Sequence, residues 1–175
     1  MLSALSSLIY LKISPERIFL KNLKSGNTIS DFPILALNVS NNSNNKVQQT
    51  VYAVGKDALQ AKKEHQDLIL KNGFEHPRVV IGEFAIAEKT VQHFLRQLDK
   101  QAIFRIRPVV ILHPLGNYDG GLSSIEINAL KEIAIGAGAR KVFIWQGREL
   151  TDHEIKTGTF PLEGWLQGVP DWIKS

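Results

Sequence analysis

Five histidines are the side chains of this sequence best suited to metal binding or acid–base chemistry: His65, His76, His93, His113 and His153. No two of them have the HxH or HxxxH spacing that places two imidazoles on one ligand face. His113 stands apart because it lies near the end of an apolar run, residues 107–114, and sites in α/β sheets gather at the carboxyl ends of strands. No acid or cysteine lies next to it in the sequence, so we expect a packing role for His113.

Other motifs for chemistry are missing from the sequence. It contains no Gly-x-Ser-x-Gly nucleophile elbow and no Gly-x-x-x-x-Gly-Lys phosphate loop. Asp119 precedes two glycines, but the loop lacks the alternating acids of an EF-hand. The absence of cysteine excludes disulfides and thiol nucleophiles. We therefore expect neither a metal nor a cofactor.

Length and composition are typical of one compact domain, with 175 residues, 43% of them hydrophobic and 22% charged. The net charge of +4 is small, and basic residues alternate with acids, as at Lys62, Lys63 and Glu64. A nucleic-acid-binding face would need a basic cluster, so we expect no nucleic-acid partner. No segment has the roughly 20 apolar residues of a membrane-spanning helix, and no secretory signal is evident. The expected location is the cytoplasm, or the inner membrane as a peripheral protein.

The elements that must position any site follow from the residue patterns. Short antiparallel strands are predicted first, in residues 8–14, 17–23, 29–38 and 46–55. A helix is expected from Asp57 to His65. A stronger one is expected over residues 85–101, where four apolar residues fall on one face: Val91, Phe94, Leu95 and Leu98.

The later part of the chain predicts a strand–helix–strand unit. The apolar run at 107–114 is typical of a strand buried on both faces. Ser123 or Ser124 can cap the next helix, and Glu126, three residues after Ser123, fits a capping box. Gly136 and Gly138 are expected to end this helix, and residues 141–146 to form the next strand. Such a unit places its two strands parallel in one sheet. The whole is a mixed α/β domain with antiparallel N-terminal strands.

The sequences "GLSSIEINALKEIAI" and "GAGARKVFI" (121–144), "HPRVVIGEFAIAEKTVQHFLRQL" (76–98) and "VYAVGKDA" (51–58) resemble the MreB family of bacterial actin-like cell-shape proteins. The resemblance is colinear from about Leu8 to Ile144 and covers the first domain of that family. It implies a ribonuclease-H-like fold, that of the actin-like ATPase domain, with flanking helices. We expect one such domain at residues 1–157, a small subdomain at 37–85, and an aromatic C-terminal tail at 158–175.

The resemblance also implies where a nucleotide would bind and why this chain departs from the pattern. The family has an Asp-Leu-Gly turn that approaches the phosphates of ATP, and this sequence has Tyr10-Leu11-Lys12 there. Tyr10 cannot help hold a metal as the aspartate does, and the Lys12 side chain obstructs the close approach that glycine allows. Lys12 could meet a phosphate only as a point charge, and a surface role is the favoured interpretation. The family's second domain has no counterpart after Ile144, so we expect a truncated pseudo-ATPase.

Glu126 matches the glutamate that positions the attacking water in this family. A capping-box acid explains the same residue, and we favour that interpretation because a water-positioning carboxylate needs a phosphate to act on. No catalytic residue is therefore assigned.

The tail departs from the family and concentrates large apolar residues: Phe160, Leu162, Trp165, Leu166, Val169, Trp172 and Ile173. We expect them to cover an exposed face of the domain's own sheet, with Trp165 and Trp172 buried against the same chain or across a homodimer contact. The alternative is that Trp165, Leu166 and Trp172 anchor a partner, since tryptophan is enriched at binding hot spots.

These observations predict a non-enzymatic MreB/actin-like protein that acts as a protein-interaction module in bacterial cell shape or filament assembly. Its partner would be another protein, such as a cell-shape filament protein, or a second copy of itself. The alternative is the nucleotide-binding half of an actin-like ATPase, completed by another chain or by a homodimer.

Overall fold

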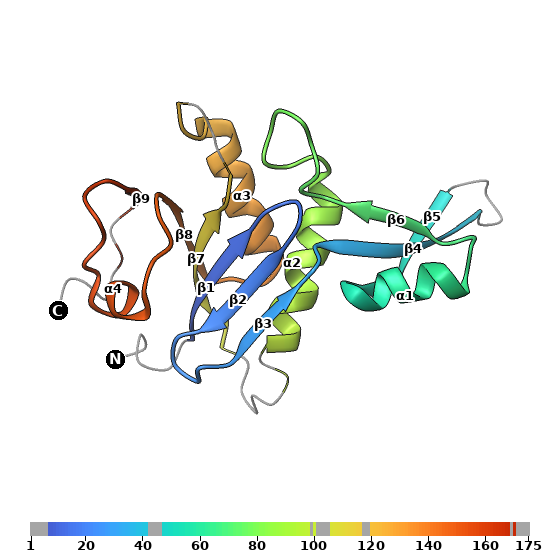
Figure 1. Ribbon diagram of the computed structural model, residues 1–175, viewed down its shortest axis with the longest axis horizontal. Coiled ribbons are helices and arrows are strands. Elements are labelled where there is room, and N and C mark those ends of the chain that lie inside the picture. The colour runs from blue at the N-terminus through green and yellow to red at the C-terminus, as the bar shows by residue number, and fades with distance from the viewer. Residues whose placement is uncertain are drawn as a thin grey trace.

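The structure is a computed structural model, and it describes residues 7–41, 47–98, 100, 106–116, 120–168 and 170. Its centre is a six-stranded mixed sheet with the strand order β3-β2-β1-β7-β8-β9 (Figure 1). The strands are β1 (Leu8–Ile13), β2 (Ile18–Asn22), β3 (Thr28–Asp31), β7 (Val109–Pro114), β8 (Lys141–Gln146) and β9 (Trp165–Gln167). β1, β2 and β3 are antiparallel neighbours, β1, β7 and β8 run parallel, and β9 runs antiparallel to β8. The predicted mixed sheet is confirmed.

Two helices, α2 (Phe84–Leu98) and α3 (Ser124–Gly136), cover one face of this sheet. α2 buries the four apolar residues that the helical spacing predicts, Val91, Phe94, Leu95 and Leu98. α3 connects β7 to β8 as the predicted parallel crossover. β7 is buried along its whole length, because it lies at the centre of the sheet and both of its faces are covered.

A second sheet, with the order β5-β4-β6, projects from one end of the first (Figure 1). It consists of β4 (Ile34–Asn41), β5 (Val47–Val54) and β6 (Ile69–Asn72), and α1 (Lys56–Glu64) lies between β5 and β6 in the chain. Ala58 and Ala61 of α1 pack against Ala36 of β4, so α1 covers one face of this small sheet. Two alanines allow the helix to approach the sheet closely.

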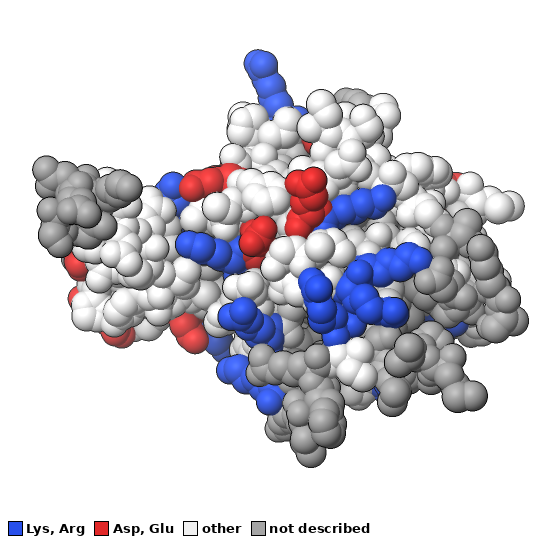
Figure 2. All heavy atoms as spheres, turned by 180° about the vertical axis from the view of Figure 1, so that it is seen from behind, with Lys and Arg blue, Asp and Glu red and all other residues white. Residues whose placement is uncertain are grey.

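The chain after β8 covers the other face of the six-stranded sheet. It contains the short helix α4 (Asp152–Thr157), and it returns to the sheet as β9. Beneath it lies a second core that includes Tyr10, Ile111, Phe143 and Trp145, with Phe160 packed against the cluster. In the view from behind (Figure 2), basic and acidic side chains both appear over the helix-covered side of the molecule. No helix among the described residues is long and apolar enough to span a lipid bilayer.

Candidate functional site

The carboxyl ends of the parallel strands β7 and β8 meet the start of α3 and the returning segment before β9. A cavity of about 640 Å³ lies there, and we call it the carboxyl-end cavity. Its lining includes His113 near the end of β7, Gly116 just after that strand, Gln146 at the end of β8, and Trp165 of β9. Open α/β sheets bind ligands at this end of their strands, so this is the first place to look for a site.

A buried hydrogen-bonded chain links three segments beside this cavity. The Tyr10 hydroxyl donates to His113 Nδ1 over 2.7 Å, and His113 Nε2 donates to the Gly147 carbonyl over 3.0 Å. The backbone N–H of Leu150 donates to the Tyr10 hydroxyl over 3.1 Å. Each donor therefore meets one acceptor when His113 is neutral and carries its proton on Nε2. These hydrogen bonds fix the segment after β8 onto β1 and β7.

Burial keeps both side chains of this pair neutral. Desolvation raises the pKa of Tyr10 to about 12, and it lowers the pKa of His113 to about 4. His113 is 2% exposed. A histidine whose two ring nitrogens are both bonded inside the protein cannot exchange a proton with a ligand unless the network opens. The structure therefore gives His113 the packing role expected from the sequence.

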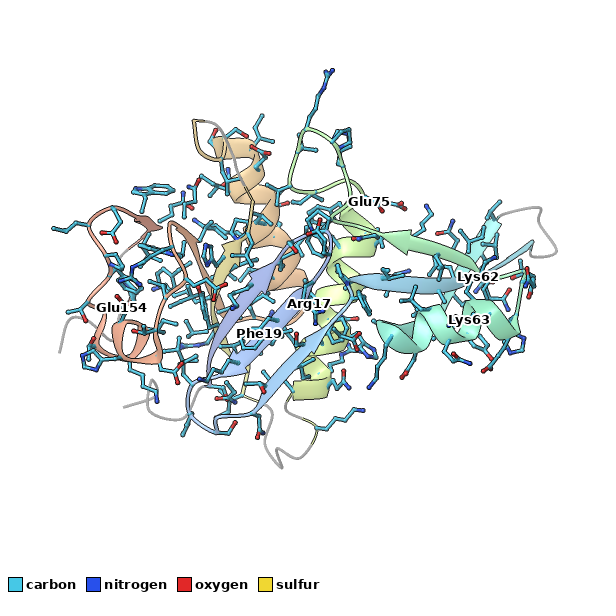
Figure 3. All side chains as sticks on the ribbon, in the orientation of Figure 1. Arg17, Phe19, Lys62, Lys63, Glu75 and Glu154 are labelled. Atoms are coloured by element: carbon cyan, nitrogen blue, oxygen red, sulfur yellow. The ribbon has the colours of Figure 1, made fainter. Side chains whose placement is uncertain are left out.

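Lys12 contacts two partners within the protein. Its ammonium lies 2.7 Å from Glu149 Oε2 and 4.4 Å from the centre of the Phe19 ring. Figure 3 shows Phe19 on β2, beside the strand that carries Lys12, and Glu154 on α4 across the same face. An ion pair combined with a cation–π contact accounts for this side chain.

Glu126 has the predicted position at the start of α3. Ser123 Oγ accepts from the Glu126 N–H over 3.3 Å, and Glu126 Oε2 accepts from the Ser123 N–H over 2.9 Å, which completes the capping box. The other carboxylate oxygen accepts from the Val80 N–H over 3.4 Å. These bonds, that of the Ser123 backbone first, lower the pKa of Glu126. Its carboxylate serves the helix and the loop before α2.

The tail is partly as expected and partly not. Phe160 and Leu166 pack against the second core, as a covering segment should. Trp165 is 48% exposed, so it is not buried against its own chain, and its burial across a contact between two copies stays a prediction. The physical reason is the alternation of a strand: Leu166 faces the second core, and its neighbour Trp165 therefore points to the other side, into the rim of the carboxyl-end cavity. Trp172 lies outside the described residues.

Trp145 is the aromatic residue that the sequence analysis missed. It is fully buried and donates from Nε1 to the Arg148 carbonyl over 2.7 Å. Its ring lies 5.7 Å from the Phe160 ring, and Gly147 and Gly164 pack against its edge. Gly147 and Gly164 could have indicated its burial from the sequence, since a glycine often marks a close approach to a bulky neighbour.

The polar groups around the cavity are thus largely committed to the protein itself. Gln146 Oε1 accepts from the Leu122 N–H over 2.8 Å and so ties the loop before α3 to the end of β8. Within the described part of the chain, no group of three or more His, Cys, Asp or Glu side chains could hold a metal ion. What the cavity offers a ligand is its glycine-rich backbone, the indole of Trp165 and the carboxylate of Glu163.

Comparison with known proteins gives the family and the fold. A family model described as MreB/Mbl protein matches residues 28–150. The cell shape-determining protein MreB of Escherichia coli (strain K12) is 34% identical over 102 residues, which are 55% of this chain and 26% of that protein. The MreB of Pasteurella multocida (strain Pm70) is 37% identical over 65 residues, 37% of this chain and 17% of that protein. The match to Escherichia coli MreB therefore spans about a quarter of the length of that protein.

Two crystal structures of MreB5 of Spiroplasma citri share the fold. The one bound to ADP has a TM-score of 0.56 and 21% identity, covering 80% of this chain and 38% of its own. The one bound to AMPPNP has a TM-score of 0.55 and 20% identity, with the same coverage. The predicted actin-like, ribonuclease-H-like fold is confirmed.

Proposed function

The chain belongs to the MreB/Mbl protein family, and on that premise we propose that it is a non-enzymatic member that acts as a protein-interaction module. Its role would lie in bacterial cell shape or filament assembly, in the cytoplasm, with another protein or a second copy as its partner. The relatives named above are cell shape-determining proteins. Because this chain spans only part of their length, none of their activities is carried over.

One observation carries the proposal: the Tyr10 side chain is buried and hydrogen-bonded within the protein. The family resemblance places this residue where an aspartate would help to hold a metal, and here it is a buried phenol. Its hydroxyl is used by His113 and by the Leu150 N–H. A neutral side chain inside such a network offers a cation no charge.

Two further residues support the same conclusion. Lys12, in the place of the glycine that lets a backbone approach phosphates, is paired with Glu149. Glu126, in the place of the water-positioning glutamate, accepts from the backbone of Ser123 and Val80. Each residue that could be a remnant of an ATPase site has an internal structural partner.

The nucleotide-binding alternative is favoured by a different observation, the carboxyl-end cavity. Its volume of about 640 Å³ and its glycines, among them Gly116 and Gly121, would give a phosphate room and backbone N–H donors. The related MreB5 structures hold ADP and AMPPNP. Under this alternative the chain would bind a nucleotide together with a second chain.

Thermal unfolding in ATP and Mg²⁺ separates the two proposals. A ligand present at a hundred times its dissociation constant stabilises the folded state by about 2.7 kcal/mol, which gives a clear rise in melting temperature. We expect no rise for the 175-residue chain at millimolar ATP and Mg²⁺. A magnesium-dependent rise would favour the nucleotide-binding half. Co-sedimentation with purified Escherichia coli MreB filaments, compared with sedimentation of the chain alone, then tests the interaction role.

A further inference from the structure

The second sheet ends in a strand whose outer edge no described residue pairs. β5 lies at the edge of the order β5-β4-β6, at the end of the molecule farthest from α4 (Figure 1). Its first six residues, 47–52, are all exposed. An edge of this length presents a row of backbone donors and acceptors to any strand that can pair with it.

Other edge strands in the described structure are protected in ways that β5 is not. β3 and β6 have four residues each and carry Asp31 and Lys71, and β9 has three residues. Short strands and charged residues are the usual defences of a sheet edge. β5 has eight residues, Val-Gln-Gln-Thr-Val-Tyr-Ala-Val, with neither a charge nor a proline.

The first two valines of β5 are placed symmetrically about Gln49. Val47 and Val51 each lie two residues from it, so antiparallel pairing of two copies about a two-fold axis at Gln49 places Val47 opposite the other copy's Val51. Gln48 then faces Thr50, and Gln49 faces itself. Paired β-branched residues stabilise a sheet, and an isologous contact needs a patch that is complementary to itself.

Register and burial place both valines on the open face of the sheet. Val51 pairs with Leu37, and Ala36, the next residue along β4, packs on α1; Val51 therefore faces away from α1. Val47 lies on the same face as Val51 because strand residues alternate. Val47 is 64% exposed and Val51 is 40% exposed. Pairing of two copies would bring four valines that now face water into cross-strand contact.

The same face carries more apolar residues next to β5. Val39 of β4 and Ile69 of β6 are 37% and 45% exposed, and Ile69 pairs with Leu37 on the side opposite Val51. Lys71 of β6, two residues from Ile69, also lies on this face, where it forms an ion pair with Glu83. The subdomain carries basic charges on α1, where Figure 3 labels Lys62 and Lys63. In the view from behind (Figure 2), the end of the molecule that bears this sheet is mostly free of coloured side chains away from its rim.

We propose that β5 pairs antiparallel with β5 of a second copy over Val47–Val51, with the two-fold axis at Gln49, and so joins two three-stranded sheets into one. The irregular register next to Tyr52, where Ala36 pairs with Ala53 and Leu37 with Val51, limits the regular pairing to those five residues. This inference rests on the proposed function, because it names the surface through which the interaction module binds a second copy of itself.

A charge exchange at Gln49 tests the geometry directly, because only a residue on the two-fold axis meets its own copy. In sedimentation of the full chain we expect Gln49→Lys and Gln49→Glu each to raise the dimer dissociation constant about tenfold or more at low salt, since like charges face each other. An equimolar mixture of the two variants should restore the dimer. Gln49 is exposed, so at concentrations where the wild-type chain is monomeric each variant should keep the wild-type melting temperature.

Matched controls use the same substitutions elsewhere. Gln48→Lys with Gln48→Glu should show a weaker rescue on mixing, because residue 48 faces Thr50 of the other copy and meets its own copy only diagonally. Thr28→Lys, on the edge strand β3 of the other sheet, should leave the dimer intact.

Two outcomes would overturn the inference in different ways. A dimer that survives both Gln49 variants would place self-association on another surface and leave the proposed function standing. A chain that stays monomeric at several hundred micromolar would exclude the β5 dimer, and co-sedimentation of that monomer with MreB filaments would then decide the proposed function separately.

Discussion

The two faces of the six-stranded sheet are covered in different ways. On one face, α2 and α3 supply rows of aliphatic side chains that interlock with the strands. On the other face, an irregular segment lies over Trp145 and is held by the bonds of Tyr10 and His113. The helices are held on their face by many similar apolar contacts. The irregular segment is held on the other face by a few specific contacts.

This difference determines where single changes should matter. Loss of one methylene from a helix face removes one contact among many, although the remaining cavity still has a cost. Over Trp145 the fit depends on two positions without side chains, Gly147 and Gly164, and on the aromatic ring of Phe160. The covering segment should therefore be the part of the domain most sensitive to substitution.

The largest effect should follow from ending the chain at Thr157. This change removes Phe160 and Leu166 from the second core and uncovers Trp145. A large aromatic residue buries about 150–250 Å², so at about 25 cal/mol per Å² its exposure should cost about 5 kcal/mol of unfolding free energy. Urea unfolding measures the loss. Trp145 is then the remaining tryptophan, and its emission should shift to the red.

The matched control for that truncation is Trp165→Ala in the full chain. It removes an aromatic residue from the same segment, but one that is 48% exposed and outside the second core. The cost should be small by comparison. If the truncated chain were as stable as the full one, the two faces would not differ in the way described.

The contrast between the faces also explains what could be predicted from the sequence. The helix-covered face follows from local rules: the spacing of Val91, Phe94 and Leu98 predicts α2, and Ser123 with Glu126 predicts the start of α3. Parallel β7 and β8 follow from the helix that connects them, because a strand–helix–strand unit places its two strands parallel. These rules use residues that are close together in the sequence.

The candidate site could not be predicted in the same way, because its contacts join distant residues. Tyr10 and His113 are separated by 103 positions, and no local sequence pattern predicts their contact. The exposure of Trp165 depends on the register of β9, which a three-residue strand does not reveal in sequence. The family resemblance placed Tyr10 at the site, but the network that occupies its hydroxyl emerged only from the structure.

The next largest effect should come from lowering the pH, which should weaken the attachment of the segment that follows β8. The pKa of His113 is about 4 in the folded protein and about 6.5 when unfolded, so between these values the unfolded chain binds more protons. Its contribution is complete above pH 6.5 and is lost as the pH falls towards 4, by on the order of 3 kcal/mol. The measurement is the unfolding free energy from pH 7.5 to 4.5. His113→Gln should flatten the slope.

His93 provides the control for that slope. Burial also lowers its pKa, but it lies on α2 and not in the second core. His93→Gln should leave most of the pH dependence in place. An unchanged slope in His113→Gln would contradict the assignment of the neutral histidine to the Tyr10 network.

A smaller loss is expected from one added methyl group at Gly164. A Cβ there would lie 2.1 Å from Cη2 of Trp145 and 2.9 Å from the Gln146 carbonyl oxygen. Gly164→Ala should cost about 1–3 kcal/mol, the usual range for overpacking. The neighbouring Leu162 is fully exposed, so Leu162→Ala should have almost no effect in the same thermal unfolding experiment. Equal effects at the two positions would show that the segment tolerates displacement from Trp145.

The smallest effect should come from the helix-covered face, at the start of α3. Ser123→Ala combined with Glu126→Ala removes the capping box and should cost about 1 kcal/mol, measured by urea unfolding. Glu126→Gln should cost less, because an amide oxygen can still accept from the Ser123 N–H, and only the charge near the helix start is lost. The depressed pKa of Glu126 makes this charge contribution complete above the unfolded pKa and lost as the pH falls through the folded one. If Glu126→Gln abolished a measured ATP hydrolysis without changing stability, the residue would position water as well as cap a helix, and the helix-covered face would carry the chemistry that we assign to neither face.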